Sequence, residues 1–241
     1  MNELLDPISP TSGLIINPDS TGLRIPKGAT TVEGFRTWFA SPDFPTDVRV
    51  SLIENELFIE SRMEDLITHN KLKTIISAIL AMMVDDRSLG HFCNDGMLVT
   101  HKKARVSTVP DGVFASFESI ESGRVRILTI GKGDLLVEWQ GSPDWVLEVV
   151  SRGSEEKDYH KLLRAYYRAG IPEYWLVDAR GDEIDFRIYK AGSKGYEAMP
   201  AQEGWIESPV FGRRFRLTRE LDRVNLWRYR LHVELLPGAS S

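Results

Sequence analysis

The stretch SPDWVLEVVS, residues 142–151, decides the fold and raises the question of function. Half of its residues are large apolar or aromatic side chains, as is typical of a strand buried on both faces, and Glu148 lies among them. Burying an ionised carboxylate in such a strand costs several kcal/mol unless a cation or a metal ion pairs with it. Glu148 is therefore the first candidate for a functional residue.

The segments that follow this strand predict its surroundings. Residues 154–169 carry apolar side chains at helical spacing, and Gly170 is a typical residue for the end of a helix. EYWLVDA, residues 173–179, is a second continuous apolar run. A strand, a helix and a strand in this order form a right-handed crossover with two parallel strands in one sheet. We therefore predict one α/β (α+β) domain with added strands, and Glu148 on a central strand.

The composition is that of a soluble globular protein, with 42% apolar and 27% charged residues in 241. The single cysteine, Cys93, excludes an internal disulfide framework and a cysteine-rich zinc site, and it favours a reducing cytoplasm. We expect no signal peptide, because residues 1–10 carry acids where a signal peptide has positive charge and no apolar core follows them. We also expect no membrane span, because no segment approaches 18 consecutive apolar residues. The net charge of −5 argues against broad, charge-driven DNA binding, although it allows a local basic groove.

The chain divides into three parts by composition. Residues 1–49 predict an irregular N-terminal arm with a short helix near 31–40, residues 50–219 the main domain, and residues 220–241 a C-terminal tail. Within the main domain, residues 50–61 predict a hairpin with Asn55 in the left-handed conformation, and residues 122–141 a hairpin turned by GKGD. Apolar spacing predicts a helix over 64–84 that turns His69 inward, where a histidine is more often a core residue than a ligand.

Two aspartates could share a site with Glu148. Asp144 lies on the same face of the strand, but four residues span roughly 13 Å, too far for one ion with oxygen ligands at about 2.0–2.1 Å. Asp111 opens the strand DGVFASF, and a hairpin leads from there to the strand of Glu148. Neighbouring strands lie about 5 Å apart, and two buried carboxylates at that distance repel unless a cation such as Mg²⁺ or Mn²⁺ separates them. The alternative is structural: Asp111 caps a strand, and Glu148 pairs with Lys161 or Arg164.

Three segments carry a resemblance to a known family: PDGVFASFESIESGRVRI (110–127), PDWVLEVVSRGSEEKDY (143–159) and YYRAGIPEYWLVDARG (166–181). They closely resemble the Uma-two family of restriction endonucleases, within the PD-(D/E)XK nuclease superfamily, and the similarity runs from about Val50 to Thr218. The resemblance implies a restriction-endonuclease-like core, in which helices flank a central mixed sheet. It also implies Mg²⁺-dependent hydrolysis of DNA phosphodiester bonds. Asp111 and Glu148 would then be the metal-binding acids, and the backbone carbonyl of Val149 would complete the metal shell.

The chain departs from the family pattern at the catalytic lysine. The superfamily motif Glu-x-Lys would need a lysine at Val150, and the position used instead in this family is Leu162 here. We expect Lys161 to orient the nucleophile or to stabilise transition-state charge, with Lys157 as the alternative. One helical step turns a side chain by about 100°, so Lys161 needs its long stem to reach the site.

A second departure lies in the hairpin near residue 50. Ser51 replaces the first glutamate of the family pattern, whereas Glu54 and Glu56 are retained. We expect Glu54 or His69 to position water. The basic stretches 101–105 and 212–219 could hold a DNA backbone, and a homodimer is one assembly that the resemblance allows. The rival hypothesis is a nuclease-fold protein that binds nucleic acid or a protein partner without cutting, which the missing lysine and the acidic balance favour.

Overall fold

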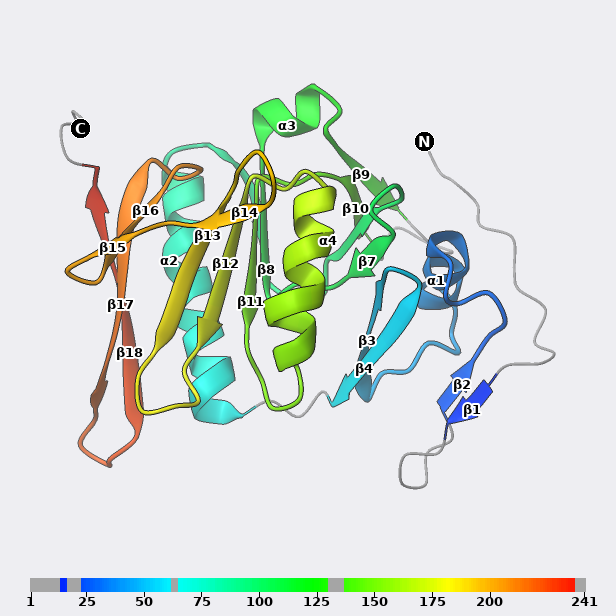
Figure 1. Cartoon of the computed structure of the whole chain (residues 1–241), viewed down its shortest axis with the longest axis horizontal. Helices are drawn as coiled ribbons and strands as arrows, with labels where there is room; N and C mark the ends of the chain where they lie inside the picture. The colour runs from blue at the N-terminus through cyan, green and yellow to red at the C-terminus, as the bar shows by residue number, and fades with distance from the viewer. Residues whose placement is uncertain (1–13, 17–22, 62–64, 130–136, 237–241) are drawn as a thin grey trace.

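The computed structural model describes residues 14–16, 23–61, 65–129 and 137–236. Within these ranges the strands form two six-stranded sheets, a four-stranded sheet and one strand pair, β1 (Leu14–Ile16) with β2 (Leu23–Ile25). Figure 1 shows the two larger sheets beside each other and the four-stranded sheet at the opposite side from the N-terminal segments. The predicted α/β class with added C-terminal strands is confirmed.

The central sheet holds the strand of Glu148. Its order is β14 (Tyr196–Ala198), β13 (Asp185–Ala191), β12 (Glu173–Asp178), β11 (Trp145–Val149), β8 (Gly112–Ser116) and β5 (Gly90–Cys93). β11 and β12 are parallel, as the crossover predicts, whereas β8 runs antiparallel to β11 with Gly112 opposite Leu147. The predicted mixed sheet and the predicted neighbour of the Glu148 strand are therefore confirmed.

Helices cover both faces of the central sheet. The crossover segment is a π-helical turn, η2 (Lys157–Leu162), followed by α4 (Leu163–Arg168), and Figure 1 shows α4 in front of the sheet and α2 (Lys71–Asp86) behind it. Strand alternation explains the division, because Val146 of β11 packs in the core with α4 while Leu147 packs in the core with α2. A second π-helical turn, η1 (Leu66–Asn70), precedes α2.

The first six-stranded sheet lies beside the central sheet. Its order is β4 (Glu56–Ser61), β3 (Val48–Ile53), β7 (Val106–Thr108), β6 (Leu98–His101), β10 (Val137–Gly141) and β9 (Val125–Thr129). The predicted hairpin is confirmed by β3 and β4, whose turn has Asn55 at φ 69°. β9 and β10 confirm the second hairpin, and its GKGD turn lies outside the described residues. A short helix, α3 (Phe117–Glu121), joins β8 to β9.

Both ends of the chain extend the main domain. The helix α1 (Val32–Phe39) shares a buried cluster with β3, in which Phe35 and Leu52 are fully buried. At the other end, the four-stranded sheet has the order β15 (Ala201–Gln202), β16 (Trp205–Ser208), β17 (Arg213–Leu221) and β18 (Trp227–Leu235). Its apolar face packs in the core with α2. The boundaries at 49 and 219 stay a prediction. No helix in the described ranges is long and apolar enough to cross a membrane.

Candidate active site

Asp111 and Glu148 lie on adjacent strands, at the point where the pairing of β8 with β11 ends. The antiparallel register puts Gly112 opposite Leu147, so the next residues along the two strands are Asp111 and Glu148. Two backbone bonds fix Asp111 there: its N–H donates to the Leu147 carbonyl at 3.1 Å, and its Oδ2 accepts the Val149 N–H at 2.8 Å. Both side chains are buried, with 1% of Asp111 and 3% of Glu148 exposed.

Three cationic or basic side chains surround the Asp111 carboxylate. Arg49 Nη1 of β3 lies 3.0 Å and Lys73 Nζ of α2 3.6 Å from Oδ1, while His69 Nε2 of η1 lies 3.3 Å from Oδ2. Burial alone would raise the pKa of Asp111. The hydrogen bond and charge of His69, together with the charges of Arg49 and Lys73, outweigh burial and hold that pKa far below its usual range. Asp111 is therefore ionised in the folded protein.

Glu148 has the opposite electrostatic environment. Its Oε1 accepts a 2.6 Å hydrogen bond from the hydroxyl of Tyr166, a fully buried residue of α4. Burial raises the pKa of Glu148 well above its usual value; the charge of Lys157 opposes this, and the charges of Asp158 and Asp111 add to it. The pKa values of the two carboxyl groups are thus shifted in opposite directions, because cations outweigh burial at Asp111 and do not outweigh it at Glu148.

A buried Lys157–Asp158 pair lies on the α4 side of Glu148. Lys157 Nζ donates to Glu60 Oε2 of β4 at 2.6 Å and lies 3.3 Å from Asp158 Oδ1. Burial would lower the pKa of Lys157, but the charges of Asp158, Glu148 and Glu60 raise it above its ordinary value. Burial raises the pKa of Asp158 to about 6 against the opposing charge of Lys157. Lys157 is therefore the cation that balances the acids on this side.

Both π-helical turns contribute residues to the cluster. η1 supplies His69, and η2 supplies Lys157 and Asp158. A π-turn is wider than an α-turn, so it changes the direction of the side chains that follow it and is frequent at functional sites. The structure thus joins β3 and β4 of one sheet, β8 and β11 of the other and two helix starts around one buried charge cluster.

Comparison with known proteins identifies the family. Residues 32–220 match the Uma2 family, described as "Putative restriction endonuclease". The chain belongs to this family. Among solved structures, one similar chain is "a putative nuclease belonging to DUF820" from Anabaena variabilis, with a TM-score of 0.51 and 16% sequence identity over 67% of this chain and 82% of that chain. That likeness supports the nuclease fold. The curated proteins give no match.

The position of Lys161 differs from the expected one. Its Nζ donates to Glu56 Oε2 at 2.7 Å, at the start of β4, and lies 5.8 Å from the centre of the Phe58 ring. Lys157, the alternative for this Uma2 chain, lies instead beside the buried acids. The two lysines are four residues apart and share one helix face, so Lys161 lies one turn further along and reaches Glu56 in place of the buried acids.

Of three other residues considered from the sequence, one lies in the cluster and two lie outside it. His69 lies against Asp111, whereas Glu54 pairs with Arg168 of α4. Asp144 lies toward the opposite end of β11, where its carboxylate accepts bonds from the Ser116 N–H and the Ser119 hydroxyl. As predicted, it is not part of the Glu148 cluster. The proposed structural partners of Glu148, Lys161 and Arg164, are replaced by Lys157 and the Tyr166 hydroxyl.

Sequence reasoning missed five residues of the cluster: Arg49, Glu60, Lys73, Asp158 and Tyr166. Lys73 had a usable signal, because it follows His69 by four residues and such pairs share a helix face. Asp158 matched the family pattern, but nothing in its spacing shows that it becomes buried. Arg49 and Tyr166 reach the site across long sequence separations, and their neighbours along the chain do not reveal this.

The donor set of the Uma2 site fits a hard divalent cation. In the described part of the chain, no group of three or more His, Cys, Asp or Glu side chains is arranged to hold a metal ion. Two carboxylates and a backbone carbonyl need no third acidic side chain, and oxygen donors of this kind suit Mg²⁺ or Mn²⁺. Asp158 Oδ1 is also buried and, within the described ranges, accepts no hydrogen bond, although the Lys157 ammonium lies 3.3 Å from it.

Proposed function

We propose that this Uma2 chain is a metal-dependent endonuclease that hydrolyses DNA phosphodiester bonds. The observation that carries the proposal is the pair of buried acids on adjacent strands, with Arg49 and His69 against Asp111 and the charge of Lys157 near Glu148. Such a pair destabilises the folded chain, and a purely structural role does not account for it. Family membership and the nuclease fold support the same activity.

Asp111, Glu148 and the Val149 carbonyl would hold a Mg²⁺ or Mn²⁺ ion. The N–H and C=O of one strand residue point to the same side, and the Val149 N–H points to Asp111, which supports the carbonyl as a third donor. When bound, such an ion polarises the phosphate and provides a water that is deprotonated at neutral pH. The Tyr166 hydroxyl keeps the Glu148 carboxyl in a fixed orientation.

The cationic side chains would act on the phosphate. Arg49 and Lys73 lie beside Asp111 Oδ1 and are within reach of a phosphate held there, so they are suited to bind its non-bridging oxygens. We assign to Lys157, in place of Lys161, the task of orienting the nucleophile or stabilising transition-state charge. His69 would position water, as expected from the sequence.

A plasmid-nicking assay tests this function. We expect the purified protein to nick supercoiled DNA in Mg²⁺ or Mn²⁺, EDTA to abolish nicking, and Glu148→Gln to lower the rate at least about 100-fold. Lys157→Gln should lower it strongly, whereas Lys161→Gln, in the same turn but paired with Glu56, serves as the matched control and should retain activity. Nicking by Glu148→Gln at the wild-type rate would contradict the assignment.

A nuclease-fold protein that binds without cutting is the second candidate. This candidate is favoured by the contacts that the Asp111 carboxylate already makes. Its two oxygens lie within reach of the Arg49, His69 and Lys73 side chains and of the Val149 N–H. A metal ion would have to displace Arg49 and Lys73 from Oδ1. DNA binding with no metal-dependent nicking by any preparation of the wild-type protein would favour this candidate.

A further inference from the structure

Positive charge is concentrated in one short segment near the C-terminus. Residues 213–230, which form β17, its turn and the start of β18, contain seven arginines and two acids in a chain of net charge −5. A local excess of this size attracts polyanions even when the whole chain is acidic. The family match ends at residue 220, so β18 lies beyond it.

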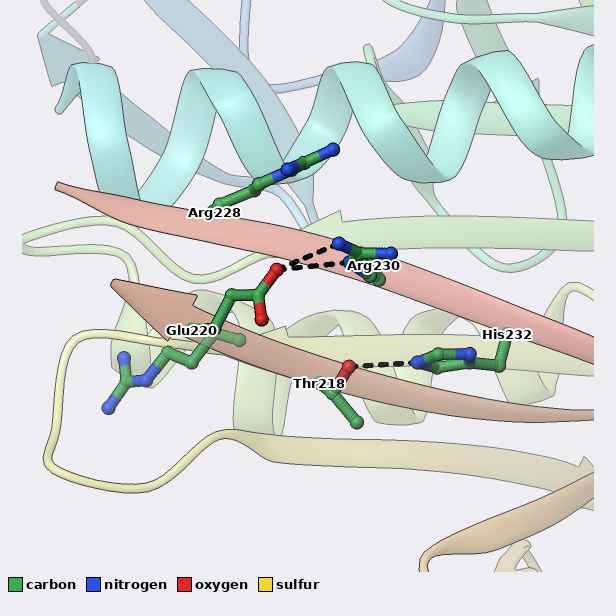
Figure 2. A pocket seen from close by; sticks show the side chains of 6 residues that line it. Thr218, Glu220, Arg228, Arg230 and His232 are labelled. Atoms are coloured by element: carbon green, nitrogen blue, oxygen red, sulfur yellow. Dashed lines mark hydrogen bonds and ion pairs between the residues drawn. The ribbon is translucent and has the colours of Figure 1, made fainter. Parts of the chain in front are cut away.

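The arginines of this β17–β18 hairpin line a hollow on its outer face. The hollow has a volume of about 440 Å³ and is lined by Thr218, Arg219, Glu220, Arg228, Arg230 and His232. Figure 2 shows Arg228, Arg230 and His232 in a row along β18, with Thr218 and Glu220 facing them from β17. This face is outward because the alternate residues, such as Phe215 and Leu231, are buried in the core with α2.

An anion can replace Glu220 as the partner of Arg230 in the hollow. Arg230 pairs with Glu220 at 2.9 Å, with both side chains more than half exposed (52% and 56%). Exposed pairs of this kind are worth about 0–1 kcal/mol, so an incoming phosphate competes with Glu220 at little cost. Arg219 alternates with Thr218 and Glu220, so its guanidinium lies on the inner face, 4.3 Å from the centre of the Trp227 ring, and the outward-facing cations of the hollow are those of β18.

The hairpin turn lies at the same edge of the fold as the candidate active site. Lys71, which lies between His69 and Lys73 in sequence, donates from Nζ to the Trp227 carbonyl at 3.3 Å. Arg219 donates to the carbonyls of Ala179 and Gly181, directly after β12, which runs parallel to the strand of Glu148. Figure 1 shows the β17–β18 turn near the start of α2. One extended ligand can therefore reach both sites.

We propose that the β17–β18 hairpin binds the phosphodiester backbone of duplex DNA that flanks the site of cleavage, through Arg228 and Arg230. The identity of the polymer rests on the proposed nuclease function; the anionic character of the ligand rests on the arginines themselves. Duplex DNA carries regularly spaced phosphates, which match a row of cations better than one small anion does.

A second copy of the chain is the competing occupant. Leu221, Val224 and Leu226 at the turn are exposed large apolar residues, and such residues are frequent in contacts between subunits. Charge favours DNA over self-association, because an identical hairpin would bring its own seven arginines against these. Sedimentation separates the two occupants: a dimer that the arginine substitutions dissociate would overturn the proposal.

The test is fluorescence anisotropy of a labelled 20-base-pair duplex in EDTA, where cleavage does not contribute. We expect Arg228→Gln/Arg230→Gln to weaken binding at least about 10-fold and to reduce the slope of log K against log salt by about 1.8, since each phosphate contact contributes about 0.9. Lysine at both positions should restore most of the affinity. The matched control is Arg168→Gln, because Arg168 is also about half exposed (51%) and paired with a glutamate, yet lies on α4.

Binding by the double variant with wild-type affinity and salt dependence would overturn the proposal, whether or not the protein cuts DNA. A melting-temperature shift by inorganic phosphate that requires Arg228, without duplex binding, would overturn it as well by showing a small-anion site. Failure of the nuclease proposal alone gives a different pattern, namely arginine-dependent binding with no nicking in Mg²⁺ or Mn²⁺. The melting temperature of each variant, without ligand, checks that the hairpin is still folded.

Discussion

In the metal-free protein, the environment of Glu148 favours an uncharged side chain, which is either the protonated carboxyl group or an amide of the same shape. Because burial raises its pKa, Glu148 retains a proton in the folded chain over a pH range in which the unfolded chain has lost it. The folded state then binds more protons, and stability falls as pH rises above the ordinary value of 4.5 toward the raised pKa. The loss is about 1.4 kcal/mol for each pH unit over which the two states differ by one proton.

Glu148→Gln should therefore stabilise the metal-free protein at neutral and alkaline pH. Glutamine keeps the shape and can accept the Tyr166 hydrogen bond, but it does not have to be deprotonated. Urea unfolding of both proteins in EDTA between pH 5 and 9 measures the effect, and the difference should grow with pH. A constant loss of stability in the variant at every pH would show that Glu148 is an ionised half of a structural pair with Lys157.

Tyr166→Phe tests the hydroxyl that orients Glu148. The substitution leaves a buried carboxyl without its 2.6 Å donor, so we expect a loss of about 1–3 kcal/mol of stability. Tyr167→Phe is the control in the same helix, since its hydroxyl donates to the Gly192 carbonyl at the partly buried surface and should cost only about 1 kcal/mol. Equal losses for the two variants, measured by urea unfolding, would remove the special role of Tyr166.

At the scale of elements, the position of each lysine along η2 determines which one is buried. Lys157 bridges Glu60 and Asp158 in the interior, while Lys161 pairs with Glu56 at the surface. Removing one partner of a buried charge cluster costs about 3–5 kcal/mol, whereas an exposed pair is worth about 0–1 kcal/mol. Lys157→Met should therefore lower the free energy of unfolding several times more than Lys161→Met. Similar values in a urea titration would contradict the assigned orientation of the helix.

The same element shows where sequence reasoning succeeds and where it stops. The apolar runs around Glu148 and in 173–179, with a helix between them, predicted the parallel pair, because burial on both faces leaves a clear pattern. The strand after Asp111 was predicted as a neighbour of the Glu148 strand, and its antiparallel direction comes from the structure. The choice between Lys157 and Lys161 was not predictable, because residues four apart share one helix face and the sequence does not show which of them reaches the buried acids. Arg49 and Tyr166 depend on how separate elements pack together.

At the scale of the whole molecule, the cluster lies where several elements of the fold meet. Asp111 joins β3, through Arg49, to the start of α2, through His69 and Lys73. Glu148 joins β11 to α4 through Tyr166, and Lys157 joins the crossover to β4 through Glu60. A change of charge at the centre therefore affects contacts between both large sheets and both helix starts. Local substitutions should change global stability for this reason.

A divalent ion should accordingly stabilise the whole chain. An ion that binds the folded state alone adds RT ln(1 + [L]/Kd), about 2.7 kcal/mol at a concentration 100 times Kd, so Mg²⁺ or Mn²⁺ should raise the melting temperature and EDTA should reverse the rise. Glu148→Gln should abolish the shift. Glu173→Gln is the matched control, because Glu173 is a carboxylate buried to a similar degree at the opposite end of β12. If both variants keep the shift, the ion binds outside the Asp111–Glu148 site, and the loss of the shift in both would point to a general effect of removing a buried charge.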